Sequence, residues 1–406
     1  MRKAGTPGLS IPDDPLILSR AKALYRTQVG WRRHLHKYPE LSNQEFQTTQ
    51  FVKQQLAKAG LRVLPLKLPT GVLAEISGSR PGPTVAIRSD LDALPIVEQS
   101  GLPFHSVRPG VMHACGHDVH MTTVLGVATI LASLKKQFRG KVRFIFQPAE
   151  EVPPGGARPM IANGALKGVD MILGLHVDPH LPTGRIGLLD GAMMASVFDF
   201  DLIIKGKGGH AARPHLAVDA ISVAAELLES IQKVVSRETD PMDPVVVSFG
   251  QIKGGTARNV VAGEVRLAGT ARALSERAYK RIPSLLKRTV DGICRARGAD
   301  FQLVPLAAYP VLRNHPAVNR LLARTCDSLF GPGRIAKVEP VLGGEDFACY
   351  LEKVPGAMLW LGVMNKRIKA DKPWHSPQFI ADEEAIRYGT AVLAGASLRF
   401  LRDGLS

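Results

Sequence analysis

The segment His113-Ala-Cys115-Gly-His117-Asp118 brings together three residue types that bind transition metals. In an extended chain, side chains two residues apart point to the same side. Cys115 and His117 could therefore bind one ion together, and thiolate and imidazole are good zinc ligands. His113 would share that side, so spacing alone leaves it as a third candidate, and Asp118 could orient an imidazole. For the Cys-x-His pair alone, a polar loop around a buried cysteine is an equally good explanation.

Two adjacent carboxylates, Glu150 and Glu151, follow an apolar run at residues 142–146. On irregular backbone they project in different directions, so one can bind a metal while the other handles the proton of an attacking water. A lone Glu-Glu pair is usually a solvated acidic loop. Its position at the end of a predicted strand favours a site, because active sites of α/β sheets lie at such ends.

Two histidines complete a set of candidate ligands. His176 ends the apolar run Gly174-Leu-His-Val, and His375 lies in Trp374-His-Ser-Pro377. Each histidine alone is more often structural than ligating. One tetrahedral ion binds four ligands, so a set of five candidates favours a site with two ions. The candidates are Cys115, His117, Glu151, His176 and His375.

A second set of polar residues lies later in the chain. His210, in a Gly-rich basic segment, could reach a developing oxyanion. Asn259 and Arg272 could hold a substrate carboxylate, which suits the guanidinium fork. Gly344, in Gly-Gly-Glu-Asp-Phe, belongs to an anion nest or a helix start. On spacing alone, ordinary turns and surface positions explain these residues better. Asp90 and Asp92 share one face of a predicted strand end and could support a ligand.

These side chains need rigid elements to hold them. Residues 1–60 have helical periodicity, and Ser42 followed by Glu45 resembles a capping box that opens a second helix. After Gly60, short apolar runs alternate with helical segments. The alternation predicts an α/β domain with a central, mostly parallel sheet. The strands are expected at 61–66, 71–76, 84–87, 142–146 and 171–175, and the helices at 119–135, 157–164 and 382–402.

Residues 196–307 form a separate pattern. Strands are expected at 198–205, 245–252, 265–271 and 301–306, and helices at 218–235 and 276–297. This β-α-β-β-α-β order is that of a ferredoxin-like α+β unit. We therefore expect a domain at 196–307 inserted into an α/β domain made of residues 1–195 and 308–406.

The charge is strongly basic but diffuse. The 406 residues carry 52 Lys and Arg against 36 Asp and Glu, a net charge of +16. The excess is +6, +3, +4 and +3 over residues 1–60, 61–195, 196–307 and 308–406. A nucleic-acid platform would concentrate this charge near stacking aromatic residues, so we expect no nucleic-acid partner.

The compartment follows from cysteine usage and the first residues. Four cysteines without a Cys-x-x-Cys pair indicate a reducing compartment. The N-terminal MRKAGTPGLSIPDDP lacks the apolar region of a signal peptide, and no apolar run approaches the ~20 residues of a membrane span. We expect a cytoplasmic protein without membrane association.

Many ordered motifs between about Trp31 and Arg387 resemble the M20 family of metallopeptidases, in particular its amidohydrolase branch. In chain order they are WRRHLHKYPELSNQE, RSDLDALP, MHACGHDVH, FQPAEE, GLHV, GKGGHAARPH, ARNVVAGEV, GTARA, GGEDF and WHSP.

The resemblance implies a site with two divalent ions, manganese or zinc, with cobalt or nickel as alternatives. It implies that the five candidate ligands hold them, that Glu150 is the general base, and that His113 is not a ligand. In the wider family an aspartate occupies the bridging place of Cys115. The position of His210 stabilises the tetrahedral intermediate in relatives, and those of Asn259 and Arg272 bind substrate. The inserted domain is implied to be a lid that mediates dimerisation, so a homodimer or homotetramer is expected.

The implied function is hydrolysis of N-acyl amino acids to a carboxylic acid and a free amino acid. The alternatives within the family are a dipeptidase, a carboxypeptidase or an N-acetyl-amino-acid deacetylase. A nucleic-acid-binding protein is the alternative from another class, and it leaves the ligand set unexplained.

Overall fold

The computed structural model describes residues 14–405, which fall into two compact units. The first unit contains the described residues up to Gly191, Asn314–Glu339 and the residues from Cys349 on. The second contains Ala192–Arg313 and Pro340–Ala348. Residues 1–13, on which the absence of a signal peptide was judged, lie outside the described residues.

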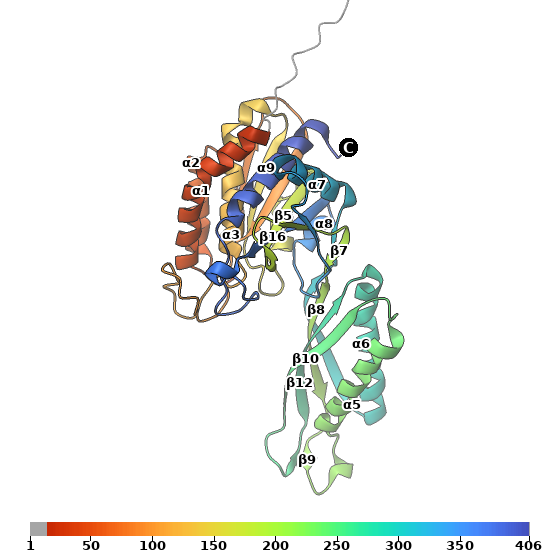
Figure 1. The fold of residues 1–406 in the computed structure, drawn as a ribbon. Coiled ribbons are helices and arrows are strands. Elements are labelled where there is room, and N and C mark those ends of the chain that lie inside the picture. The colour runs from red at the N-terminus through yellow and green to blue at the C-terminus, as the bar shows by residue number, and fades with distance from the viewer. Residues whose placement is uncertain (1–13, 406) are drawn as a thin grey trace, which may run out of the picture. The chain divides into compact units, whose positions relative to one another are not determined.

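The first unit is built on an eight-stranded sheet (Figure 1). Its four central strands β4, β3, β5 and β16 are parallel, and antiparallel pairs occur nearer both edges. This parallel centre confirms the expected α/β sheet. The strands in spatial order are β1 (Arg62–Leu64), β2 (Val72–Ser77), β4 (Lys141–Gln147), β3 (Thr84–Asp90), β5 (Met171–Pro182), β16 (Gly356–Met364), β6 (Ile186–Leu188) and β15 (Ile335–Lys337).

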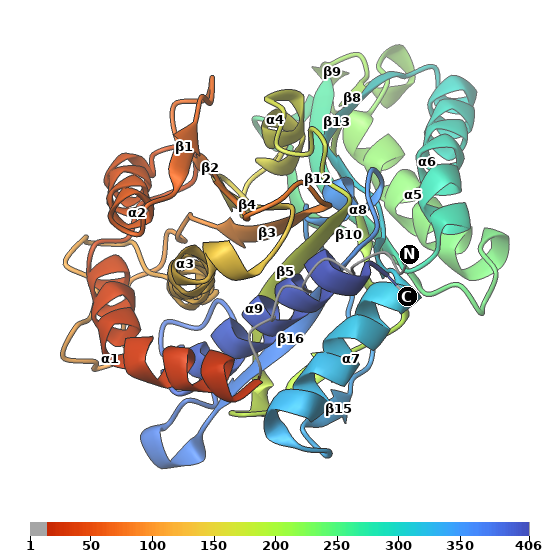
Figure 2. The same ribbon diagram turned by 90° about the horizontal axis from the view of Figure 1, so that it is seen from above.

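Helices α3, α9 and α7 lie along one face of this sheet (Figure 2). α3 is buried along nearly its whole length, which explains its near-continuous apolar sequence. The main core lies between these helices and the sheet. The helices of the first unit are α1 (Asp14–Lys37), α2 (Phe46–Lys58), α3 (His117–Ser133), α4 (Ala157–Ala162), α7 (Pro316–Phe330), α8 (Ala348–Leu351, whose first residue belongs to the second unit) and α9 (Ala385–Asp403), with 3-10 turns at Lys135–Gln137 and Lys366–Ile368.

The expected second helix is confirmed, but the expected capping box is wrong. α2 begins at Phe46, and the side chain of its N-cap residue, Glu45, makes no capping hydrogen bond. The Ser42 hydroxyl instead donates to Asp92 Oδ2 at 2.7 Å. The Glu45 carboxylate accepts from the backbone N–H groups of Asn43 and Ala149. Both residues of the expected box are therefore bonded to other parts of the chain.

The second unit has a four-stranded antiparallel sheet in the order β10-β12-β8-β13. Helices α5 and α6 pack on one face of it (Figure 1). Along β8, Phe198, Phe200, Leu202 and Ile204 alternate toward the helices, and Asp199 and Asp201 lie between them. The elements are β7 (Gly191–Met194, whose first residue belongs to the first unit), β8 (Ser196–Lys205), β9 (Gly209–His210), a 3-10 turn at Pro214–Leu216, α5 (Ala220–Lys233), a π turn at Val234–Glu238, β10 (Val245–Gly254), β11 (Val260–Val261), β12 (Glu264–Ala273), α6 (Glu276–Arg297), β13 (Asp300–Tyr309) and β14 (Leu312–Asn314, whose last residue belongs to the first unit).

None of the helices in residues 14–405 is long and apolar enough to cross a membrane.

Candidate metal centre

The five candidate ligands all belong to the first unit. Cys115 lies just before α3, and His117 is the first residue of that helix. Glu151 follows β4, His176 lies in β5 two residues beyond its last pair with β3, and His375 lies in the segment between β16 and α9. Four separate segments thus bring potential ligands to the carboxyl ends of the central parallel strands, where α/β proteins place their sites.

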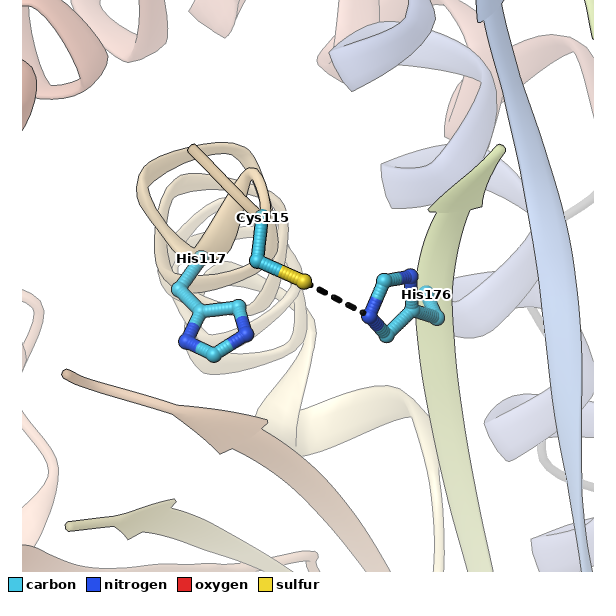
Figure 3. Close-up of side chains that lie close together, drawn as sticks. All are labelled: Cys115, His117 and His176. Atoms are coloured by element: carbon cyan, nitrogen blue, oxygen red, sulfur yellow. Dashed lines mark hydrogen bonds between the residues drawn. The ribbon is translucent and has the colours of Figure 1, made fainter. Parts of the chain in front are cut away.

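Cys115 is the centre of this group. Its Sγ lies 3.4 Å from His176 Nε2, and His117 lies on its other side (Figure 3). One potential ligand atom from each of the three residues lies within 4.8 Å of the other two, and all three residues are buried. The Cys-x-His pair is therefore part of a cluster that includes a histidine from another strand.

The local backbone differs from the extended segment that the spacing argument assumed. Gly116 has a φ of +87° and precedes α3 in a left-handed conformation. A Cβ there would lie 2.5 Å from Val177 Cγ2, so glycine is required on both counts. The assumption of extended backbone was wrong, and Cys115 and His117 approach each other through a sharp turn.

Glu151 connects the remaining candidates. Its Oε1 lies 3.7 Å from His117 Nε2 and 3.5 Å from His375 Nε2. Cys115, Glu151 and His375 form one group of potential ligands, and His117, Glu150 and Glu151 form another. Glu150 thus lies beside the ligand candidates.

The positions of the potential ligand atoms suit a shared metal ion better than hydrogen bonds between them. His117 Nε2 and Glu151 Oε1 are buried, and neither has a hydrogen-bond partner among the described residues. Two ligands of one tetrahedral zinc ion, at bond lengths of ~2.0–2.3 Å, lie ~3.3–3.8 Å apart. The separations of Glu151 Oε1 from both imidazoles fall in this range. Unpaired buried polar atoms are costly, and a cation would satisfy both.

His113 stands apart from these groups. It is buried, and neither ring nitrogen has a hydrogen-bond partner among the described residues. It belongs to none of the groups of potential metal ligands found in residues 14–405. Burial lowers the pKa of its imidazole to about 4, so the ring is neutral at pH 7.

The orientation of two candidate imidazoles is fixed by backbone carbonyl groups. His117 Nδ1 donates to the Asp92 carbonyl at 2.9 Å, which turns Nε2 toward Glu151. His176 Nδ1 donates to the Val177 carbonyl at 2.8 Å, which leaves Nε2 facing Cys115. Such bonds from the second ring nitrogen are typical of metal-binding histidines. Asp92 Oδ2 also accepts from the Glu151 backbone N–H at 2.9 Å, as expected for a supporting carboxylate.

One supporting histidine was missed from the sequence. His120 is fully buried, and its Nδ1 donates to Asp90 Oδ1 at 2.8 Å. Its Nε2 accepts from the Val177 N–H at 2.9 Å, and Trp374 Nε1 donates to the Val177 carbonyl at 2.9 Å. His120 and Trp374 therefore hold the peptide groups next to His176. The three-residue spacing from His117 to His120, one helical turn, was the available signal.

The electrostatic environment favours a cation. Burial raises the pKa of the Cys115 thiol well above its usual value, and Glu151, Glu150 and Asp90 raise it further. Burial lowers the pKa of His117, but Asp90, Asp92 and Glu151 outweigh it and raise that pKa to about 10. Burial drives the pKa of His176 well below its usual value. Without an ion, the cluster therefore keeps protons on Cys115 and His117.

Backbone strain occurs at two residues around the cluster. Ala149, just before the two glutamates, has a φ of +52°, and His375 has a φ of +62°. The left-handed region costs a residue with a side chain ~1–2 kcal/mol. His375 is held there by a hydrogen bond from its N–H to the Ala114 carbonyl at 2.9 Å. Such strain persists where surrounding contacts compensate for it, typically at functional sites.

The role suggested for Asp118 is wrong for the candidate ligands. Its Oδ2 accepts from Arg32 Nε at 2.8 Å and from His36 Nδ1 at 2.9 Å. Although burial raises the pKa of Asp118, Arg32 and His36 hold it well below its usual range. Asp118 therefore fixes the start of α3 against α1.

We expect Arg32→Ala to lower the free energy of unfolding by about 3–5 kcal/mol, because it removes one partner of a fully buried ion pair. Urea denaturation monitored by circular dichroism measures this change. Arg33→Ala is the matched control, since Arg33 is half exposed and its pair with Glu383 is worth at most about 1 kcal/mol. Equal losses in both variants would contradict the role of the buried pair.

The other candidate residues belong to the second unit. His210 lies in β9, pairs with Val260 of β11 and is exposed. The exposed Asn259 is adjacent, because its carbonyl accepts from the Ala211 N–H at 3.1 Å. Arg272 and Gly344 also lie together, since a Cβ on Gly344 would be 2.8 Å from Arg272 Nη1. The second unit thus gathers its four candidates into two pairs.

Comparisons with known proteins are consistent with this arrangement. A sequence model of peptidase family M20/M25/M40 matches residues 86–399. The N-acetylcysteine deacetylase of Bacillus subtilis is 39% identical over 92% of this chain and 96% of its own length. The N-acyl-L-amino acid amidohydrolase of Geobacillus stearothermophilus is 46% identical over 68% of this chain and 74% of its own. A solved Bacillus subtilis structure, described as a dinuclear metal binding peptidase from family M20, has a TM-score of 0.81 at 36% identity, with 94% of this chain and 99% of that chain covered.

Proposed function

The chain belongs to peptidase family M20/M25/M40, and we propose that it is a metal-dependent amidohydrolase that hydrolyses N-acyl amino acids to a carboxylic acid and a free amino acid. The observation that carries this proposal is the convergence of Cys115, His117, Glu151 and His375 around unpaired buried donor atoms, with Glu150 beside them. The acylated amino acids in the names of two relatives support the substrate class.

The proposed cofactor is a pair of divalent ions. The residues proposed to hold them are Cys115, His117, Glu151, His176 and His375. The description of the solved relative as a dinuclear metal binding peptidase supports two ions. Thiolate and imidazole suit zinc, manganese is the alternative, and cobalt or nickel would also be accepted by these ligands. When bound, such ions polarise the amide carbonyl and make a water molecule acidic enough to be activated near pH 7.

Residues of the protein have separate roles in proton transfer, oxyanion stabilisation and substrate binding. Glu150 removes the proton from the attacking water and returns it to the nitrogen of the leaving amino acid. His210 donates a hydrogen bond to the oxyanion that forms on the carbonyl carbon. Arg272 binds the substrate carboxylate through its guanidinium fork, with the backbone at Gly344 beside it. Asn259 contacts the substrate from its place beside His210. A carboxylate next to the amide is what separates an N-acyl amino acid from a simple amide.

We also propose roles for the domains predicted from the sequence. Residues 1–195 and 308–406 form the catalytic domain, and 196–307 form a ferredoxin-like lid that mediates a homodimer or homotetramer. The β-α-β-β-α-β order and the strand order β10-β12-β8-β13 support the ferredoxin-like assignment. We propose a cytoplasmic location from the four free cysteines.

A hydrolysis screen tests the function. Purified protein loaded with Zn, Mn, Co or Ni is incubated with N-acyl amino acids that differ in acyl group and side chain, and the free amino acid is measured. Dipeptides and N-acetyl amino acids are included to separate the peptidase and deacetylase alternatives. We expect turnover of acyl amino acids, and much weaker turnover of matched amides that lack the carboxylate. Preference for dipeptides would replace this proposal with the peptidase alternative.

We expect Cys115→Ala to lower the bound metal per subunit, because it removes the thiolate from the centre of the cluster. Elemental analysis after gel filtration measures the metal, and circular dichroism checks the fold. Cys326→Ala is the control, since Cys326 is also buried but belongs to α7. An unchanged metal-to-protein ratio in Cys115→Ala would exclude Cys115 as a ligand.

A further inference from the structure

The backbone N–H groups of the residues before and after Glu150 both donate to buried carboxylates. The Ala149 N–H donates to Glu45 Oε1 at 2.8 Å, and the Glu151 N–H donates to Asp92 Oδ2 at 2.9 Å. Both acceptors lie far from the loop in the sequence, 104 and 59 residues away. The backbone of the loop that carries Glu150 and Glu151 is therefore held by hydrogen bonds both before and after Glu150.

Glu45 occupies a rigid position. It is fully buried, directly precedes α2, and also accepts from the Asn43 N–H at 3.0 Å. One turn into α2, Thr49 Oγ1 accepts from the Gly71 N–H at 2.9 Å, which ties this end of the helix to the start of β2. Gly71 lies against the same loop, because a Cβ there would be 3.0 Å from Pro148 Cδ. The start of α2 and the loop thus form one packed structure.

The bond to Glu45 acts at the strained residue of the loop. Ala149 has a φ of +52°, a conformation that a residue with a side chain adopts only when other contacts hold it there. A buried hydrogen bond from its N–H to a carboxyl group is such a contact. Relaxation of Ala149 would rotate the chain that follows, and with it the direction of the Glu150 side chain.

We propose that Glu45 is a positioning residue for Glu150: by accepting the Ala149 N–H, it holds the loop in the strained form that directs the Glu150 carboxylate toward the reacting water. This inference rests on the proposed function, because it needs Glu150 to be the general base. Glu45 makes no contact with substrate in this role and acts only through the backbone of the loop.

The test compares acceptor-removing and acceptor-keeping variants of the metal-loaded protein. Removing a hydrogen-bond partner that supports an active group from behind typically costs ~10–100-fold in activity, as known for the partners of metal ligands. We expect Glu45→Ala to lower kcat by that factor, with KM and metal per subunit within about twofold of the parent protein. Glu45→Leu fills the volume without offering an acceptor and gives the same result if Glu45→Ala fails to fold. Glu45→Gln keeps an acceptor oxygen and restores most of kcat.

Glu40→Ala is the matched control. Glu40 accepts from the N–H groups of Gln47 and Thr48, so it supports the same end of α2 without contacting the loop. We expect this variant to lose stability but to keep its kcat. If Glu40→Ala lost as much kcat as Glu45→Ala, Glu45 would only stabilise the start of α2, and the proposal would be overturned.

The failures of the two proposals are distinguishable. Parental kcat in Glu45→Ala and Glu45→Leu, together with an inactive Glu150→Gln, would overturn the positioning role alone. Substantial activity in Glu150→Gln would instead overturn the assignment of the general base, whatever the Glu45 variants do.

Discussion

Glu150→Gln is expected to lower kcat by ~10²–10⁴-fold, the usual contribution of a general acid–base group. Glutamine has the same shape as glutamate but cannot take a proton from water or return one to the leaving amine. The backbone of the loop is held by Glu45 and Asp92, so the substitution should leave the neighbouring Glu151 in place. KM and metal content should therefore stay close to those of the parent protein. Steady-state kinetics and elemental analysis on the same preparation measure both.

The adjacent variant Glu151→Gln is the control that separates the two glutamates. Glu151 Oε1 lies near two imidazoles, whereas the proposed role of Glu150 is in proton transfer. We expect Glu151→Gln to lose metal as well as activity, and Glu150→Gln to lose activity only. If Glu150→Gln kept more than a tenth of the parental kcat, another residue would have to be the base.

The apparent affinity for divalent metal is expected to rise steeply with pH. Ligand cysteine must be a thiolate and ligand histidine must be neutral. In the metal-free cluster the pKa of Cys115 is raised well above its usual value, and that of His117 is raised to about 10. Near pH 7 both groups therefore carry protons that the metal has to displace. With about two protons released per binding event, the affinity should increase by up to ~100-fold per pH unit below these pKa values.

Competition with a chelator of known pH dependence, between about pH 6 and 8, measures this slope. Proton release on metal addition in weak buffer gives an independent count. The Cys115→Ala variant is the control, because it removes one of the two protons and should reduce the slope by about one power of ten. An affinity that does not change with pH would contradict the protonation states assigned to the cluster.

The sequence predicted the elements of the site better than the contacts between them. Apolar runs predicted the strands. The candidate ligands could be recognised because Glu150 and His176 are polar residues that lie where apolar runs end. His375 was a candidate from its residue type and its place in the Trp-His-Ser-Pro segment, but its contact with Glu151 could not be predicted, because it joins positions more than two hundred residues apart.

The errors have a common physical cause. Asp118 was expected to orient a ligand imidazole, and Glu45 was expected to take part in a local helix cap. In the structure Asp118 accepts from Arg32 and His36 of α1, and Glu45 accepts from the distant Ala149 N–H as well as from Asn43, so packing of distant elements supplies most of these donors. Local spacing carries no information about such contacts, and a buried carboxylate takes whichever donor the packing supplies.

The position of β16 determines when the eight-stranded sheet can form during synthesis on the ribosome. This strand pairs with β5 on one side and β6 on the other, so residues from late in the chain complete the middle of the eight-stranded sheet. Until residue 364 has emerged, β5 and β6 each have an unpaired edge, which is the feature that promotes aggregation of nascent chains. The chain of Ala192–Arg313 is made before that point. Nascent chains that stall between residues 313 and 364 should therefore be the ones that depend most on chaperones.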